Sequence, residues 1–166
     1  MIRFLLLFLL IQMVLFTVEL LQPVQVAAII PWTQLLADLS AWLVTLFDPN
    51  VVAHGKVLRH TGNGFAVSIE AGCNGVEATI VLLAAILAFP ASWKHKLLGF
   101  ALGFVAIQAL NLVRIISLFY LGQWDYEVFE WAHLYVWQAL IMLDALVVFL
   151  VWLRMLPPRR VATVTE

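Results

Sequence analysis

Cys73 is the only cysteine among the 166 residues of this chain, and it lies in the stretch "EAGCNGVE" at residues 70–77. A single cysteine excludes an internal disulfide, so the thiol is either a small buried apolar group or a reactive one. Gly72 and Gly75 flank it directly before an apolar run, which predicts that Cys73 stands at the N-terminal end of a helix. Free N–H groups and the helix dipole at such a position favour the thiolate, the nucleophilic form of cysteine.

Two further residues could act on such a thiol. Arg114 interrupts an otherwise apolar run at residues 97–120, and His133 is the third residue of the run at 131–153. A neutral histidine can accept a proton from a thiol, whereas an arginine stays charged and can stabilise developing negative charge. Charge inside an apolar span is costly and indicates a functional site.

Neighbouring polar residues are predicted to support these three. Asn111 lies one helical turn before Arg114, and Glu77 lies one turn after Cys73. Glu77 could pair with Arg114, orient His133 or only pack, and pairing with Arg114 is the first expectation. Gly75 is expected to keep the sulfur approachable.

Other polar residues are assigned no catalytic part. Glu19 and Asp144 lie in apolar runs and are expected to pair with polar groups of neighbouring helices. His54 and His60 lack a third ligand nearby, so no metal site is predicted, and nothing indicates a cofactor.

The composition places these residues in a membrane. Hydrophobic residues make up 64% of the chain, charged residues only 11%, and the mean hydropathy is +1.03. A single soluble core of this size could not hide so much apolar surface, so the sequence predicts an all-α membrane protein in direct contact with the lipid bilayer. A net charge of −1 without a basic run gives no indication of a nucleic-acid partner.

Four apolar runs are predicted to span the bilayer within one membrane domain covering residues 1–166. Three of them, at about 4–21, 97–120 and 131–153, are long enough for the roughly 20 residues that a crossing needs. The fourth, at about 74–89, is short and is ended by Pro90. The first could also be a signal peptide, but its length favours an uncleaved anchor.

Residues 31–70 are predicted to lie outside the hydrocarbon on the outer face. Residues 31–47 have apolar positions at helical spacing with polar ones between them, which is typical of a helix in the interface plane. In residues 51–70, the turn formers Gly62, Asn63 and Gly64 separate two β-prone stretches and predict a small β-hairpin.

The basic residues fix the orientation, because cytoplasmic loops are enriched in lysine and arginine. They lie before the first span, in the loop after Pro90 and after the last span: Arg3, Lys94, Lys96, Arg154, Arg159 and Arg160. Both termini are therefore predicted to be cytoplasmic in the inner membrane. This topology brings Cys73, Arg114 and His133 to the outer face.

The ordered set of motifs resembles the exosortase/archaeosortase family. The set consists of a Cys-x-Gly at the start of a span ("CNGVE", 73–77), an Asn-x-x-Arg in the next ("NLVRI", 111–115), and a histidine opening the last ("WAHLYV", 131–136). The chain has one clear span before the cysteine, where the family usually has more, so it resembles the short members, of the exosortase H type.

This resemblance implies a membrane-embedded cysteine transpeptidase or protease. Its substrates would be membrane-anchored proteins with a C-terminal sorting signal, composed of a short motif, a transmembrane helix and a basic cluster. By the same resemblance, Cys73 would be the nucleophile, His133 the acid/base and Arg114 the oxyanion stabiliser. The alternative is a non-catalytic membrane subunit that binds lipid headgroups or a partner through Arg114.

Overall fold

A computed structural model describes residues 2–157 and shows a mainly helical chain with one small sheet. The expectation of an all-α membrane protein is therefore confirmed. In chain order the elements are α1 (Ile2–Glu19), α2 (Gln22–Val24), the π-helical η1 (Gln25–Ile29), α3 (Ile30–Thr45), β1 (Val51–His54), β2 (Val57–His60), β3 (Ala66–Ser68), α4 (Val76–Ala88), α5 (Trp93–Trp124), α6 (Tyr126–Trp131), the π-helical η2 (Ala132–Val136) and α7 (Trp137–Met155).

Four helical stretches are long and apolar enough to cross a membrane: Ile2–Glu19, Gln22–Thr45, Trp93–Trp124 and Tyr126–Met155. Three of them coincide with predicted spans. The predicted span at 74–89 forms a helix of only 13 residues, α4. The stretch that ends in α3, predicted to be interfacial, meets the length and composition of a span.

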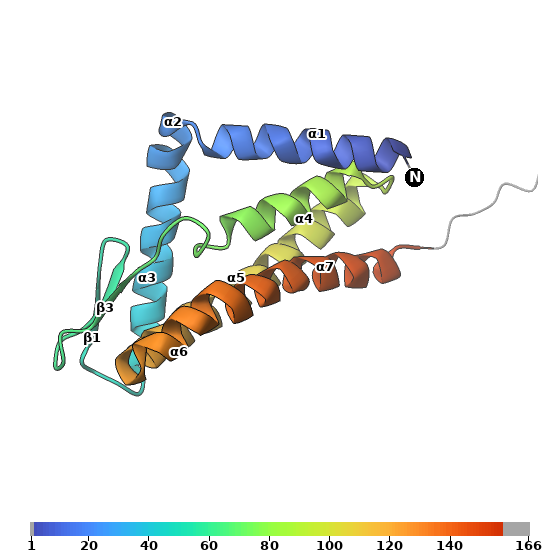
Figure 1. Cartoon of the computed structure of the whole chain (residues 1–166). Helices are drawn as coiled ribbons and strands as arrows, with labels where there is room; N and C mark the ends of the chain where they lie inside the picture. Colours follow the sequence, from blue (N-terminus) through green and yellow to red (C-terminus); the bar gives the residue numbers. More distant parts are fainter. Residues whose placement is uncertain (1, 158–166) are drawn as a thin grey trace, which may run out of the picture.

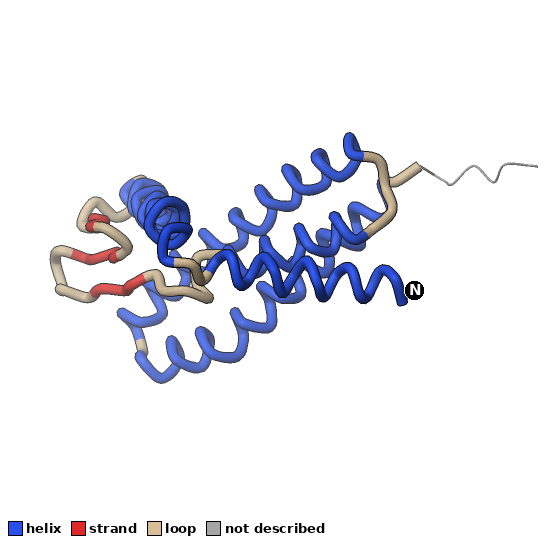
Figure 2. Tube along the Cα trace, turned by 90° about the horizontal axis from the view of Figure 1, so that it is seen from above, coloured by secondary structure: helices blue, strands red, loops and turns tan. Residues whose placement is uncertain are grey.

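The orientation of α3 sets it apart from the other long helices. In Figure 1, α1, α4, α5 and α7 run in broadly similar directions, while α3 stands across one end of them, beside the sheet. Figure 2, turned by 90°, shows α3 nearly end-on and α1 along its length. This crosswise orientation is the one expected of a helix in the interface plane, and the placement of α3 in the membrane stays a prediction.

The packing face of α3 consists largely of small residues. Its buried residues include Thr33, Ala37 and Ser40, whereas Leu35 and Trp42 are exposed. The hydroxyls of Thr33 and Ser40 donate back to carbonyls one turn earlier, which satisfies them inside the interface. Leu36 and Val44 pack into the core, whereas Leu35, Leu39 and Trp42 face outward, where lipid can cover them.

The sheet contains three antiparallel strands in the order β1-β2-β3 instead of a single hairpin. The predicted turn at residues 62–64 does connect β2 to β3. The extra strand, β1, pairs with β2 across a two-residue turn at Gly55 and Lys56, in the register His54↔Val57. Gly55 has a φ of 58°, which is typical of the first central residue of a type II′ turn.

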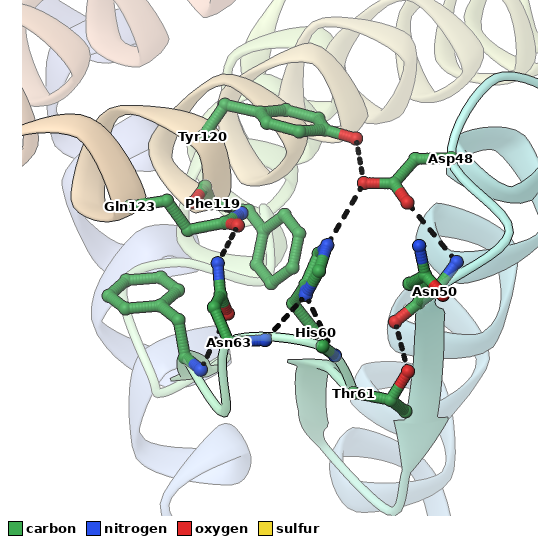
Figure 3. Close-up of polar contacts among 10 residues, drawn as sticks. Asp48, Asn50, His60, Thr61, Asn63, Phe119, Tyr120 and Gln123 are labelled. Carbon is green, nitrogen blue, oxygen red and sulfur yellow. Dashed lines mark hydrogen bonds and ion pairs between the residues drawn. The ribbon is translucent and has the colours of Figure 1, made fainter.

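A network of polar contacts fixes the sheet to the C-terminal end of α5 (Figure 3). The hydroxyl of Tyr120 donates to Asp48 Oδ2 at 3.2 Å, and His60 Nε2 lies 3.5 Å from the same oxygen. Asn63 Nδ2 donates to Gln123 Oε1 at 2.7 Å. The sheet, from which the chain continues to Cys73, is thus held against the helix that carries Arg114.

Two glycines of α5 allow close packing of the bundle. A Cβ atom at Gly99 would lie 2.2 Å from the Trp152 ring of α7, and one at Gly103 would lie 2.5 Å from Leu82 of α4. Any larger residue would push these helices apart, which sets the distance between α5 and the helix that begins beside Cys73.

Two predicted polar pairs are not formed. Asp144 Oδ2 is buried without a hydrogen-bond partner. Over residues 2–157, the carboxylate of Glu19 forms no hydrogen bond or ion pair, although the residue is buried. Arg159 and Arg160, used to predict the topology, lie outside the described residues.

Candidate active site

The turn before α4 presents the thiol. The backbone N–H of Cys73 donates to Glu70 O at 2.9 Å, closing a tight turn. Gly72 and Gly75 have φ values of 83° and 72°, a region that residues with a Cβ rarely adopt. Gly75 is the N-cap residue of α4. Two glycines are therefore required here by the path of the backbone, and they fix Cys73 at the start of the helix, as predicted.

His133 meets the thiol from the other side. Its Nε2 lies 3.1 Å from Cys73 Sγ. It belongs to η2, close to the start of the helical stretch that continues as α7. The ring of Phe129, one turn earlier, stacks on the imidazole at 5.7 Å between centroids and an interplanar angle of 16°. This contact restricts rotation of the imidazole and keeps Nε2 directed at the sulfur.

Arg114 of α5 also contacts the thiol. Its Nη1 donates to Gly72 O at 3.0 Å, and its Nη2 lies 3.5 Å from Cys73 Sγ. The residue is only 1% exposed. A permanent cation so well shielded from water acts strongly on nearby negative charge, because little solvent screens it. The thiol of Cys73 is therefore in contact with both of the other residues singled out in the sequence, His133 and Arg114.

The electrostatics of the thiol differ from the sequence-based expectation. Burial raises the pKa of Cys73 above its usual value, and the nearby Arg114 guanidinium lowers it by a smaller amount. The carboxylates of Glu77 and Glu70 also raise it. The sequence predicts that the helix N-terminus favours the thiolate, but the net pKa of Cys73 is raised, because the cost of burying a negative charge is larger. This thiol needs a base to ionise, and His133 is in contact with it.

Glu77 does not pair with Arg114, which corrects the first expectation for this residue. Its Oε1 accepts a hydrogen bond from the backbone N–H of Gly72 at 2.6 Å. The carboxylate therefore braces the turn, while the Arg114 guanidinium is occupied by Gly72 O and the sulfur. An acidic residue in the first turn of a helix also interacts favourably with the helix dipole.

Gln108 is a neighbour of the site that was not predicted. Its Nε2 lies 3.3 Å from both Gly75 O and Thr79 Oγ1. A signal for it exists, because Gln108, Asn111 and Arg114 follow one another at a spacing of three and so share a helix face. Asn111 is completely buried on this face, and neither polar atom of its side chain has a hydrogen-bond partner.

Contacts from α3 to the turn were also not predicted. Trp32 Nε1 donates to Asn74 O at 3.2 Å, and Asn74 Nδ2 donates to Thr33 Oγ1 at 3.3 Å. Asn74 Oδ1 in turn accepts from Val76 N at 3.1 Å. The residue next to Cys73 is thus fixed by the crosswise helix, a contact that no local pattern indicates.

The arrangement can carry out nucleophilic chemistry, since the thiol lies within hydrogen-bonding reach of both a proton acceptor and a buried cation. Within residues 2–157, no three His, Cys, Asp or Glu side chains are grouped so that they could hold a metal ion.

A family model described as transmembrane exosortase (Exosortase_EpsH) matches residues 1–156, nearly the whole chain. No curated protein and no solved structure shows a significant match.

Proposed function

The chain belongs to the transmembrane exosortase family, and on this premise we propose that it is a membrane-embedded cysteine transpeptidase or protease with Cys73 as its nucleophile. The observation that carries the proposal is the contact of Cys73 Sγ with both His133 Nε2 and Arg114 Nη2, at 3.1 Å and 3.5 Å. Family membership supports a multi-pass membrane protein that acts on proteins.

The reaction begins with transfer of the thiol proton from Cys73 to His133 Nε2. The thiolate then attacks the carbonyl carbon of the scissile peptide bond, and the carbonyl electrons move onto oxygen. The Arg114 guanidinium beside the sulfur stabilises this oxyanion. When the intermediate collapses, the imidazolium returns the proton to the leaving amine, and an acyl thioester remains on Cys73. An acceptor nucleophile or water, deprotonated by His133, then releases the thiol.

The substrate class follows from the family and the proposed topology. We take it to be membrane proteins with a C-terminal sorting signal, made of a short motif, a transmembrane helix and a basic cluster. With both termini cytoplasmic in the inner membrane, the sheet, α3 and Cys73 lie on the outer face. A substrate helix that lies beside the bundle would then present the residues preceding it at the level of Cys73.

The burial of Arg114 disfavours the alternative role of a headgroup-binding subunit. The residue is 1% exposed, and its guanidinium already donates to Gly72 O. A lipid phosphate could reach it only if the turn carrying Cys73 moved away.

Substrate processing tests the proposal directly. The chain is co-expressed with membrane proteins that carry candidate C-terminal signals from the same genome, and their size is followed by immunoblot. Cys73→Ala, Arg114→Ala and His133→Ala should abolish the shortened product at unchanged protein level. Cys73→Ser should retain at most a trace, because a hydroxyl is a far weaker nucleophile at neutral pH.

Matched controls are available on the sheet. Arg59→Ala and His54→Ala remove an exposed arginine and an exposed histidine from β2 and β1 and should leave processing unchanged. Normal processing by Cys73→Ala would overturn the proposed mechanism.

A further inference from the structure

Two polar residues of α5 contact the turn that carries Cys73, and a third polar residue lies between them on the helix. Arg114 contacts Gly72 and Cys73 at one end of this face, and Gln108 contacts Gly75 at the other. Asn111 lies midway between them on the same helix face, three residues from each. It therefore shares the helix face from which Gln108 and Arg114 reach the turn.

This face carries an unusual number of unsatisfied polar atoms. Gln108 Oε1, Asn111 Oδ1, Asn111 Nδ2 and Arg114 Nε are all buried without a hydrogen-bond partner. Asn111 is 0% exposed and Gln108 is 7% exposed, so bulk water does not satisfy them. Each buried polar atom without a hydrogen-bond partner lowers the stability of the folded protein by roughly 1–3 kcal/mol. Packing alone would favour leucine or methionine at position 111.

The mixture of atoms indicates which ligand they suit. The two side-chain oxygens accept hydrogen bonds, whereas Asn111 Nδ2 and Arg114 Nε donate them. A metal ion would use only the acceptors, and a carboxylate or phosphate only the donors. A water molecule donates two hydrogen bonds and accepts two, and buried waters typically make about three hydrogen bonds to such groups.

We propose that Gln108, Asn111 and Arg114 bind one ordered water molecule beneath the turn of Cys73, and that Asn111 is a positioning residue for Arg114 through this water. The water bridges the Asn111 amide to Arg114 Nε and so fixes the plane of the guanidinium. Nη1 then stays on Gly72 O and Nη2 stays beside Sγ. The catalytic part of this inference rests on the proposed function, whereas the water site does not.

Two variants of the full-length protein separate positioning from packing. Asn111→Leu keeps the branched shape of the side chain but removes both hydrogen-bonding atoms and displaces the water, so the variant should still fold, with an unfolding temperature close to that of the wild type. Its processing activity should nevertheless fall about tenfold or more, because the guanidinium is no longer held in place. Asn111→Ser keeps a donor and an acceptor with room for water and should retain most of the activity.

Alkylation of Cys73 distinguishes the two roles, because a purely structural role of Asn111 would leave its pH profile unchanged. In purified Asn111→Leu, the pH profile of iodoacetamide labelling of Cys73 should shift to higher pH, because a displaced cation stabilises the thiolate less. Gln12→Leu is the matched control. Gln12 Oε1 is also buried and unpartnered, but it lies on α1, so this change should leave both labelling and processing as in the wild type.

A high-resolution experimental structure tests the water itself. Density for one water is expected within hydrogen-bonding distance of the Asn111 amide and Arg114 Nε. Direct protein partners for both groups, or wild-type labelling and processing in Asn111→Leu, would overturn the inference. Should the wild type process no substrate, the proposed function fails, while the water and the labelling profile still decide the water site.

Discussion

The sulfur of Cys73 lies 3.1 Å from Nε2 of His133, and the two residues are 60 positions apart in the chain. The contact joins the start of α4 to η2, near the start of the last long helical stretch. It gives a half-buried thiol, whose pKa is raised by partial burial, a direct partner for its proton. Ionisation of Cys73 is thus coupled to the geometry between two helices.

The pH dependence of the thiol follows from this environment. Because burial raises the pKa of Cys73, alkylation by iodoacetamide should reach its half-maximal rate at a pH above that of an ordinary thiol. Arg114→Gln should move the midpoint further up, because the guanidinium lowers the pKa, whereas Arg59→Gln on the exposed sheet should not. A midpoint below the ordinary value would show that the thiolate is already formed.

The same shift makes a prediction for stability. A raised pKa means that the native state holds the thiol proton more tightly than the unfolded state does. The resulting stabilisation is complete below the ordinary thiol pKa and is lost as pH rises through the raised native value. As the pH rises, the unfolding temperature of the wild type should therefore fall relative to that of Cys73→Ala. A difference that is constant with pH would contradict this.

Phe129 should matter through the orientation of His133. The ring stacks on the imidazole, so Phe129→Leu frees the imidazole to rotate, and processing should fall several-fold at unchanged protein level. Trp131→Leu changes an exposed aromatic residue two positions away and is the control. Equal activity of the two variants would mean that the stacking does not orient His133.

The two glycines beside Cys73 should differ in their tolerance of alanine. Both have positive φ, so each substitution costs about 1–2 kcal/mol in backbone strain. A Cβ at Gly75 would also lie 2.8 Å from Gln108 Nε2, whereas one at Gly72 has open space. Gly75→Ala should therefore lower folded yield more than Gly72→Ala. The double variant Gly75→Ala/Gln108→Ala should recover part of the loss, and no recovery would exclude the clash.

Tyr120 should stabilise the sheet locally. Tyr120→Phe removes the hydroxyl that donates to Asp48, a loss of about 1 kcal/mol. Amide hydrogen exchange of β1 and β2 should speed up, while exchange in α4 stays as in the wild type. Tyr126→Phe, at an exposed position, serves as the control. Faster exchange throughout the protein would instead indicate that the sheet and the bundle unfold together.

The positions of Cys73, Arg114 and His133 could be predicted because polar residues are rare in apolar helices. The predicted helix lengths and the distribution of basic residues then place these three residues at the same depth in the membrane. The role of Glu77 could not be predicted, since its partner is the backbone of Gly72, which carries no sequence signal. The glycine-rich turn at 62–64 predicts only two strands, and the third, β1, is indicated in the sequence by Gly55 alone. Trp32 contacts Asn74 only because α3 lies across the bundle.

The length of α4 has a consequence for the lipid. Thirteen residues give a helix of about 20 Å, some 10 Å less than a typical hydrocarbon core. If α4 crosses as proposed, with Lys94 and Lys96 holding its inner end at the cytoplasmic surface, hydrophobic mismatch must thin the bilayer around it or leave Cys73 below the outer headgroups. The acyl-chain length of the lipids would then determine how deep Cys73 lies in the membrane, and so how deep the scissile bond of a substrate must reach.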